Sequence, residues 1–388
     1  MSAITNSSNR VASRRSKKSG RRVSGLVALG FVVAVAVMQP GVAKVAASKG
    51  MVFSLSNAPW GNSVLVFRRN QDGSLEPGRP VFTGGKGTGD GLGNQGALAL
   101  SDSGKWLLAV NPGSDSITVF LVTGERILRR EVQPSLGEQP ISVTIENDLV
   151  YVLNAGSDAI QGFRLDAWGR LTPIAHSRRK LSGNGVGAAQ VSFNRDGDLL
   201  AVTEKATNRV VTFEVDGDGR PGEANVYDSP APTPFGFAFG RRDQMLVSEA
   251  AGGATGASTL SSWQLAGDGS ASLISAAVPS QQSAACWVAV SRDGHLAYVT
   301  NTRSDNVSTY AVADNGSVGL AEAAAGQTGS GSAPTDIALD RNNRFLYTLN
   351  PGNGTISAFS VDETGVLQLV EHQVVNAGSG RVTGLVAR

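Results

Sequence analysis

Tyr298-Val299-Thr300-Asn301 ends a short β-rich run, and a turn follows it directly. Runs of the same kind end in Asn or Glu at six further places, which are Asn57, Asn111, Asn154, Glu204, Glu249 and Asn350. Successive ends lie 43 to 54 residues apart, which is the period of a propeller blade. The repeat therefore predicts seven similar sheets stacked around one axis.

A single repeat shows how each sheet is built. Val191-Ser192-Phe193 is a short apolar run, Asn194-Arg195-Asp196-Gly197 is a turn signal, and residues 199–203 form a second β-rich run. An Asp-Gly pair between two such runs is a strong hairpin signal. A third run over residues 209–215 alternates with period two, and a poorly apolar edge strand follows it. The sequence thus predicts an all-β, seven-bladed β-propeller with four-stranded antiparallel blades.

The two ends of the repeat region complete the ring. The C-terminal run Val382-Thr383-Gly384-Leu385-Val386 has the character of a first strand, but no second strand follows it. Residues 51–56 have the character of a second strand without a first. Pairing of these N- and C-terminal strands would remove two exposed sheet edges, so we expect it to close the ring.

The first 47 residues are of a different kind. Seven Arg and Lys side chains between Arg10 and Arg22 precede an apolar stretch from Leu26 to Met38, and the small residues Val45-Ala46-Ala47 follow. This order is typical of an export signal. An uncleaved N-terminal anchor is the alternative, although the apolar stretch is short for a membrane span of roughly 20 residues. We therefore expect residues 48–388 to form one exported propeller domain, in the periplasm, outside the cell or at the cell envelope.

The net charge and the number of cysteines argue against a nucleic-acid partner and against an internal disulfide. Residues 1–47 hold eight of the 34 basic side chains and none of the 32 acidic ones, so the remainder carries a net charge of about −6. Nucleic-acid binding requires a basic patch, and we expect no such partner. Cys286 is the only cysteine and cannot form an internal disulfide. We expect a monomer that contacts a membrane only through an uncleaved N-terminal segment.

Blade geometry predicts where a site would lie. First and second strands are antiparallel, so the start of each first strand and the end of each second strand meet at one end of the ring. The carboxylates Glu204 and Glu249 would lie there, and we interpret them as candidate acid/base catalysts. The candidate substrate-binding residues at the same end are Lys205, Gln190, Phe235, Trp287, Asp336, Asn301 and Arg303. If Glu204 and Glu249 approach each other, the pKa of one should rise.

Structural roles are open for several of these residues. Asn at a strand end commonly caps a turn. Glu204 would stabilise a loop if it paired with Lys205 or Arg209, and Cys286 is more typical of packing than of a nucleophile without a histidine. The glycine-rich residues 84–89 precede a strand instead of a helix, which indicates a flexible loop and not a phosphate site. No histidine cluster suits a metal, and we expect no cofactor.

The repeats ending in Tyr298-Val299-Thr300-Asn301, the Asp-Gly hairpins and the ring-closing ends resemble the lactonase family of seven-bladed propellers, over residues 51–388. Residues 203–208, 234–239, 248–250 and 284–287 are similar to an exported bacterial branch of that family. The resemblance implies hydrolysis of a lactone ring in a sugar-acid or muconate-type molecule, with a glutamate best matched by Glu249.

This chain departs from the family pattern at two places. The family's His-Pro-His-like and Pro-Arg-His-like segments correspond to Gly187-Ala188-Ala189 and Pro234-Phe235-Gly236, so the His and Arg of the family site are missing. Two functions are therefore open. One is a lactone hydrolase that uses Glu249 or Glu204 with water, and the other is a non-catalytic ligand- or protein-binding propeller of the cell envelope.

Overall fold

The structure, a computed structural model, describes residues 50–378 and 381–388. The chain divides into two units, residues 1–45 and residues 46–388. The predicted export signal lies outside the described residues. Among the residues that are described, no helix is long and apolar enough to cross a membrane.

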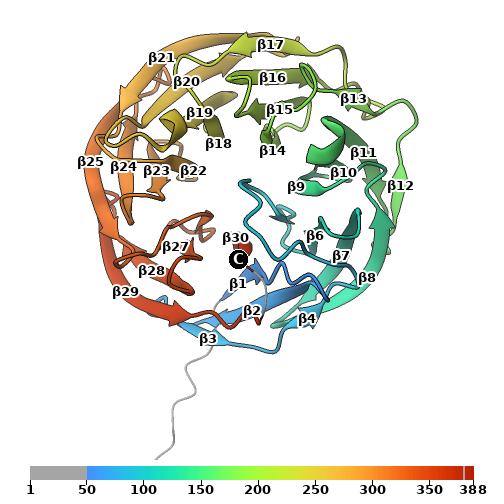
Figure 1. Cartoon of the computed structure of the whole chain (residues 1–388), viewed down its shortest axis with the longest axis horizontal. Helices are drawn as coiled ribbons and strands as arrows, with labels where there is room; N and C mark the ends of the chain where they lie inside the picture. The colour runs from blue at the N-terminus through green and yellow to red at the C-terminus, as the bar shows by residue number, and fades with distance from the viewer. Residues whose placement is uncertain (1–49, 379–380) are drawn as a thin grey trace, which may run out of the picture. The chain divides into compact units, whose positions relative to one another are not determined.

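Seven antiparallel sheets, or blades, surround a central axis (Figure 1). This confirms the predicted seven-bladed propeller. The innermost strands of blades 1 to 7 are β30 (Thr383–Ala387), β5 (Leu98–Leu100), β9 (Pro140–Glu146), β14 (Ala188–Phe193), β18 (Pro234–Phe239), β22 (Ala285–Val290) and β26 (Ile337–Leu339). The second strands, in the same order, are β1 (Gly50–Leu55), β6 (Trp106–Asn111), β10 (Leu149–Asn154), β15 (Leu199–Glu204), β19 (Gln244–Glu249), β23 (Leu296–Asn301) and β27 (Phe345–Asn350).

The outer half of each blade consists of a third strand and an edge strand. The third strands of blades 1 to 7 are β2 (Ser63–Arg69), β7 (Ser116–Thr123), β11 (Ala159–Leu165), β16 (Arg209–Glu214), β20 (Thr259–Leu265), β24 (Asn306–Val312) and β28 (Thr355–Val361). The edge strands are β3 (Leu75–Pro77) with β4 (Val81–Phe82), β8 (Arg126–Pro134), β12 (Leu171–Pro173) with β13 (Arg179–Lys180), β17 (Asn225–Asp228), β21 (Ala271–Pro279), β25 (Val318–Gln327) and β29 (Leu367–Val374). In blades 1 and 3 the predicted fourth strand is therefore split into two short pieces. Two 3-10 turns, η1 (Ala155–Ser157) and η2 (Ala251–Gly253), follow second strands.

The ring closes as the sequence predicts. β1 pairs antiparallel with β30, with Val52 opposite Ala387 and Leu55 opposite Thr383. The N-terminal strand thus becomes the second strand of a blade whose first strand is the C-terminal one. Side chains between blades form the core, as where Tyr151 and Phe193 meet edge to face with ring centroids 5.6 Å apart.

The two ends of the ring differ in the segments they carry. At one end, here called the Asn face, six of the second strands end in the predicted Asn or Glu. The exception is β1, which ends at Leu55, two residues before Asn57. At the opposite end, here called the hairpin face, turns join first strands to second strands. Glu204 and Glu249 both end second strands and so lie at the Asn face, as predicted.

Candidate functional site

A loop closes the centre of the Asn face. We call residues 92–96, which precede β5, the plug. In Figure 1 the cyan segment leading toward β6 runs into the middle of the ring. The Lys205 Nζ donates to the carbonyl of Gly93, and the Trp287 Nε1 donates to the carbonyl of Asn94. These two partners come from blades 4 and 6, so the plug reaches across the axis from blade 2.

Two further side chains hold the plug. Asn94 donates through Nδ2 to the carbonyl of Ile141 in blade 3, and its Oδ1 accepts from Thr383 in blade 1 at 3.3 Å. The carboxamide of Gln95 binds both backbone groups of Val288 in blade 6, accepting from its N at 3.1 Å and donating to its O at 3.0 Å. The glycine-rich residues 84–89 lie in a loop, as expected, but sequence reasoning missed that residues 92–96, which follow them, block the predicted mouth.

Three of the predicted site residues gather around the plug. The Lys205 Nζ lies 4.8 Å from the centre of the Phe235 ring, and that ring lies 5.0 Å from the Trp287 ring. Burial lowers the pKa of Lys205 to about 8. Trp287 is buried, whereas Lys205 and Phe235 are half-buried. The cluster therefore anchors the plug and presents only a small surface at the Asn face.

Glu204 is buried in a loop junction. It accepts hydrogen bonds from the backbone N of Ser182 at 2.9 Å, from the Ser182 hydroxyl, and from Thr207 Oγ1 at 2.6 Å. Arg209 donates to the same Ser182 hydroxyl at 3.2 Å. Glu204 thus ties the connection between blades 3 and 4 to the end of β15 through Ser182, and its side chain is 0% exposed.

Glu249 occupies the position that Asn takes in other blades. Asn350 donates to Thr355 at 3.1 Å and to Ser357 at 2.7 Å, both on the neighbouring third strand. Glu249 also bonds to the third strand of its own blade, but as an acceptor: Thr259 Oγ1 donates to it at 2.6 Å. Its other carboxylate oxygen is buried without a hydrogen-bond partner among the described residues. Burial raises the pKa of Glu249 to about 7, and the hydrogen bond from Thr259 opposes that rise.

The structure does not bring the two glutamates into one pocket. Each binds groups of its own blade or of the adjoining connection, and the pKa of Glu249 is raised by burial, with no contribution from Glu204. The strand-end Asn side chains do not cap their own turns in the expected way. Asn111, Asn301 and Asn350 instead donate to side chains five and seven positions later on the third strand.

The other predicted residues of this face lie apart from a cavity. Asn301 is fully buried, and Arg303 is exposed and donates to the carbonyl of Gly253 at 2.9 Å. Cys286 is buried, and burial raises the pKa of its thiol to about 12. A thiol with such a pKa is almost never a thiolate at neutral pH, which fits a packing role.

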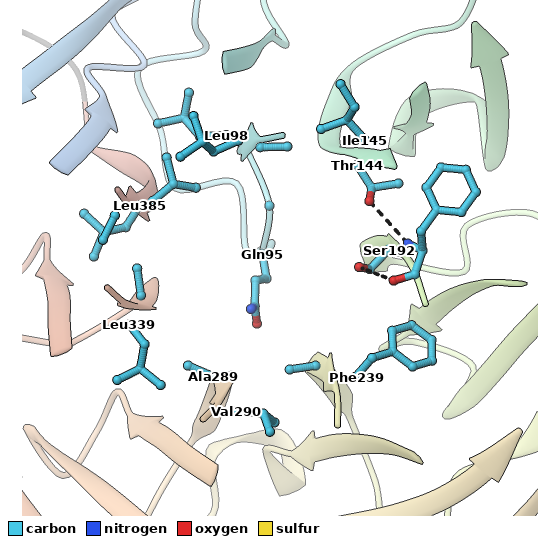
Figure 2. A pocket seen from close by; sticks show the side chains of 18 of the residues that line it. Gln95, Leu98, Thr144, Ile145, Ser192, Phe239, Ala289, Val290, Leu339 and Leu385 are labelled. Carbon is cyan, nitrogen blue, oxygen red and sulfur yellow. Dashed lines mark hydrogen bonds between the residues drawn. The ribbon is translucent and has the colours of Figure 1, made fainter. Parts of the chain in front are cut away.

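A cavity of about 670 Å³ lies on the axis and extends to the hairpin face. Figure 2 shows Gln95 in its middle, with Thr144, Ser192 and Ala289 among the surrounding side chains. The residues that line it on each innermost strand include a successive pair near the C-terminal end of the strand. The pair is a small residue followed by a larger one in six blades, and the order is reversed in blade 1. These pairs are Ala99-Leu100, Thr144-Ile145, Ser192-Phe193, Ala238-Phe239, Ala289-Val290, Ala338-Leu339 and Val386-Ala387.

Two of the predicted substrate-binding residues line this cavity. Gln190 binds the backbone of Phe237 in the next blade, accepting from its N at 2.7 Å and donating to its O at 3.0 Å. Asp336 accepts from the backbone N of Gly384 at 2.7 Å. Burial raises the pKa of Asp336 to about 7, and the backbone N–H groups of Gly384 and Gly96 oppose that rise. These polar groups lie toward the plugged end of the cavity.

The rim of the cavity consists of turns at the hairpin face. Arg195, Arg292, Arg341 and the acidic residue Asp102 come from these turns, and the acidic residue Glu146 ends β9 beside them. Sequence reasoning missed this end of the channel. The available signal was the recurrence of two successive residues, usually one small and one larger, just before each first hairpin turn, but it spans only two residues per repeat.

Comparison with known proteins gives a consistent result for the fold. A family profile described as lactonase, 7-bladed beta-propeller, matches residues 60–181 and 250–384. The solved periplasmic gluconolactonase of Pseudomonas aeruginosa is 17% identical, with a TM-score of 0.69 and coverage of 87% of this chain and 98% of that one. A candidate 6-phosphogluconolactonase from Bacteroides fragilis is 18% identical, with a TM-score of 0.69 and coverage of 89% and 99%. No curated protein matches. At these identities, the structural likeness shows the fold alone.

Proposed function

Because the chain belongs to the lactonase family of seven-bladed β-propellers, we propose that it binds one small organic molecule in its axial cavity and acts outside the cytoplasm. The observation that carries this proposal is the cavity itself. Its volume of about 670 Å³ is within the usual range for small-molecule sites. Fixed polar groups that converge on the cavity, here Gln190 and Asp336, are also typical of such sites.

The closed Asn face supports placing the ligand at the hairpin face. A ligand at the Asn face would have to displace the plug and its bonds to four other blades. A ligand at the hairpin face enters a space that already exists. Pre-formed sites bind without the cost of reorganising the protein.

Thermal-shift screening against lactones, sugar acids and other organic acids tests this proposal. A bound molecule should raise the melting temperature, and above its Kd the rise should follow the logarithm of the ligand concentration. The variant Ala289→Trp places a large side chain in the cavity, whereas Ala324→Trp on edge strand β25 places the same side chain away from the cavity. We expect the first variant to abolish the shift and the second to keep it. A ligand that stabilises both equally would bind elsewhere.

Hydrolysis of a lactone ring is a second candidate, and the carboxyl of Asp336 in the cavity favours it. A carboxylate with a pKa near 7 is suited to general-base catalysis at neutral pH. In this proposal the base takes a proton from water, the resulting hydroxide attacks the lactone carbonyl, and the ring oxygen leaves with a proton as an alcohol. The product is an open hydroxy acid.

Glu249 and Glu204 are the other carboxylates proposed for this reaction. Both are 0% exposed, so water would reach them only after the Asn face opens. The rates at which the variants Asp336→Asn, Glu249→Gln and Glu204→Gln hydrolyse gluconolactone and muconolactone show which of the three carboxylates acts as the general base. Loss of a general base lowers the rate by about 10²- to 10⁴-fold. If only Asp336→Asn shows this loss, the reaction takes place in the cavity, and if no variant shows it, the binding function stands alone.

Export is part of the proposal, and the basic and apolar segments of residues 1–47 support it. N-terminal sequencing of protein recovered outside the cytoplasm would test it. We expect a mature chain that begins near residue 48. A chain that keeps residues 1–47 and sediments with membranes would support the anchor instead.

A further inference from the structure

Two arginine side chains cross the mouth of the axial cavity at the hairpin face. Arg195, in the turn between β14 and β15 of blade 4, donates through Nη2 to the carbonyl of Arg292 in blade 6 at 3.3 Å. Arg341, in the turn between β26 and β27 of blade 7, donates through Nη2 to the carbonyls of Ser101 and Asp102 in blade 2, with 3.3 Å to the first. Both arginines line the cavity, and each passes over the blade that lies between its two ends.

In the two blades that are passed over, blades 5 and 1, the arginine at this end of the ring points away from the axis. Arg241, in the turn between β18 and β19 of blade 5, forms an ion pair with Asp314 in the outer hairpin of blade 6. In blade 1, Arg388 follows β30 and donates to the carbonyl of Gly124 in the outer hairpin of blade 2 at 3.3 Å. Neither arginine is among the described residues that line the cavity. The space over these two blades is therefore left for the crossing arginines.

A third hydrogen bond joins the two crossings into one series. Asn343, in the same turn as Arg341, accepts through Oδ1 from the backbone N of Arg292 at 3.1 Å. The series therefore runs from blade 4 to blade 6, from blade 6 to blade 7, and from blade 7 to blade 2. We call its four members, Arg195, Arg292, Asn343 and Arg341, the strap. The strap spans every blade of the ring apart from blade 3.

The strap is held by contacts that can open without unfolding a blade. Arg195 and Arg341 are exposed, and among the described residues each holds the far side of the mouth through Nη2 alone. Because water replaces a lost partner at the surface, one such hydrogen bond shifts an equilibrium by only about two- to tenfold. An arginine side chain also regains rotamer freedom when it is released. The closed strap should therefore be the major state, with an open state that is regularly visited.

We propose that the strap limits the size of the molecules that enter the axial cavity, and that Arg195 and Arg341 swing aside to admit a larger one; this rests on the proposed binding function. A small molecule passes beside the closed strap, whereas a bulky molecule enters only while the strap is open. The entry rate of a bulky molecule is then reduced to the fraction of time for which the strap is open. The acceptors of both arginines are backbone carbonyls, so replacing the arginines removes the strap and keeps the turns that form the rim.

Labelling of a cysteine placed in the cavity tests this without a ligand. Ala289→Cys places a thiol on the cavity wall, and Ala321→Cys places one on the exposed edge strand β25. The native Cys286 is buried, so the unmodified chain gives the background. The probes are two uncharged maleimides, N-ethylmaleimide and the bulkier N-(1-pyrenyl)maleimide. We expect Arg195→Ala combined with Arg341→Ala to speed labelling of position 289 by the pyrenyl reagent about tenfold, and to leave labelling by N-ethylmaleimide nearly unchanged.

Controls separate the failure of this inference from the failure of the proposed function. Labelling at position 321 should be equal in all variants, and Arg126→Ala on the outer strand β8 should leave labelling at position 289 unchanged. Labelling of Cys286 in the arginine variants would reveal a loss of the fold, and each single arginine variant should then show part of the effect. An unchanged pyrenyl rate, or an equal gain for both reagents, would overturn the inference while the open cavity remained. If neither reagent labels position 289 in any variant, the cavity has no open mouth and both proposals fail.

Discussion

At the scale of the residue, the repeated Asn position explains why Glu249 is unusual. In blades 2, 6 and 7 the strand-end amide donates to side chains of the third strand. A carboxylate at the same buried position has no N–H to donate and must instead accept from Thr259. One of its oxygens has no partner among the described residues. The charged form is therefore disfavoured, and the pKa of Glu249 rises to about 7.

We predict that Glu249→Gln stabilises the protein at alkaline pH. The pKa of Glu249 is about 4.5 when unfolded and about 7 when folded, so the folded state binds the proton more tightly. The free energy of unfolding should therefore fall as the pH rises from about 4.5 to about 7, by up to about 3 kcal/mol for a shift of this size. Glutamine stays neutral, so this loss should disappear.

Urea unfolding at pH 4 and pH 8 provides the measurement. The midpoint for Glu249→Gln should exceed that of the wild type at pH 8 and match it at pH 4. Glu76→Gln is the control, because Glu76 is exposed on the outer strand β3. Lower stability of Glu249→Gln at pH 8 would contradict the assignment of Glu249 as a buried, strained carboxylate.

At the scale of the element, the tyrosine of the repeat ties three of the blades, blades 3, 6 and 7, to the next blade. Tyr151, Tyr298 and Tyr347 lie on second strands, and their hydroxyls donate to the carbonyls of Gly219 at 2.7 Å, Gly365 at 3.3 Å and Gly73 at 3.0 Å. Each glycine lies in the outer hairpin of the following blade with φ between 77° and 93°, a region that favours glycine. The tyrosine of the second strand and the glycine of the outer hairpin are thus the two partners of one hydrogen bond between neighbouring blades.

We predict that replacing these tyrosines by phenylalanine lowers stability in the order of their hydrogen-bond lengths. Tyr151→Phe should cost about 1 kcal/mol, because it leaves a buried carbonyl without its donor. Tyr298→Phe, with the longer bond, should cost less. The reference is Tyr310→Phe, whose hydroxyl is 3.5 Å from the carbonyl of Val278. Urea midpoints measure the series, and equal values for Tyr151→Phe and Tyr310→Phe would contradict the inter-blade tie.

Sequence reasoning predicted the strands well because alternation and Asp-Gly turns are local signals. Six of the predicted strand ends, Glu204 and Glu249 included, fall where the structure has them. It failed for the plug because Gly93-Asn94-Gln95 has no periodic pattern, and its role depends on partners such as Trp287 that are distant in sequence. It predicted the face on which the glutamates lie but not the direction of their side chains, which depends on third-strand hydroxyls.

At the scale of the whole molecule, one strand pairing decides whether the ring is closed. β30 supplies the innermost strand of blade 1, and Asp336 of blade 7 accepts a hydrogen bond from Gly384 within it. Chain ends in many domains tolerate truncation. Here the first and last strands of the propeller are needed to complete blade 1. The sequence predicted this closure from two unmatched strands.

We predict that deletion of residues 382–388 opens the ring. The inner edge of β1 would lose its partner, and exposed strand edges promote aggregation. Thermal unfolding should lose its single cooperative transition, and size-exclusion chromatography should show oligomers. A synthetic peptide of residues 381–388 should restore the monomer if closure is the cause. A truncated protein that melts like the wild type would contradict the role of β30.

The central claim is that the ligand site is the axial cavity at the hairpin face. A crystal structure of the protein with the molecule that the thermal-shift screen finds tests it most directly. Electron density for the ligand should lie in the axial cavity, between Val290 and Leu339. Density at the Asn face next to Lys205 and Glu249, with the plug displaced, would contradict the claim.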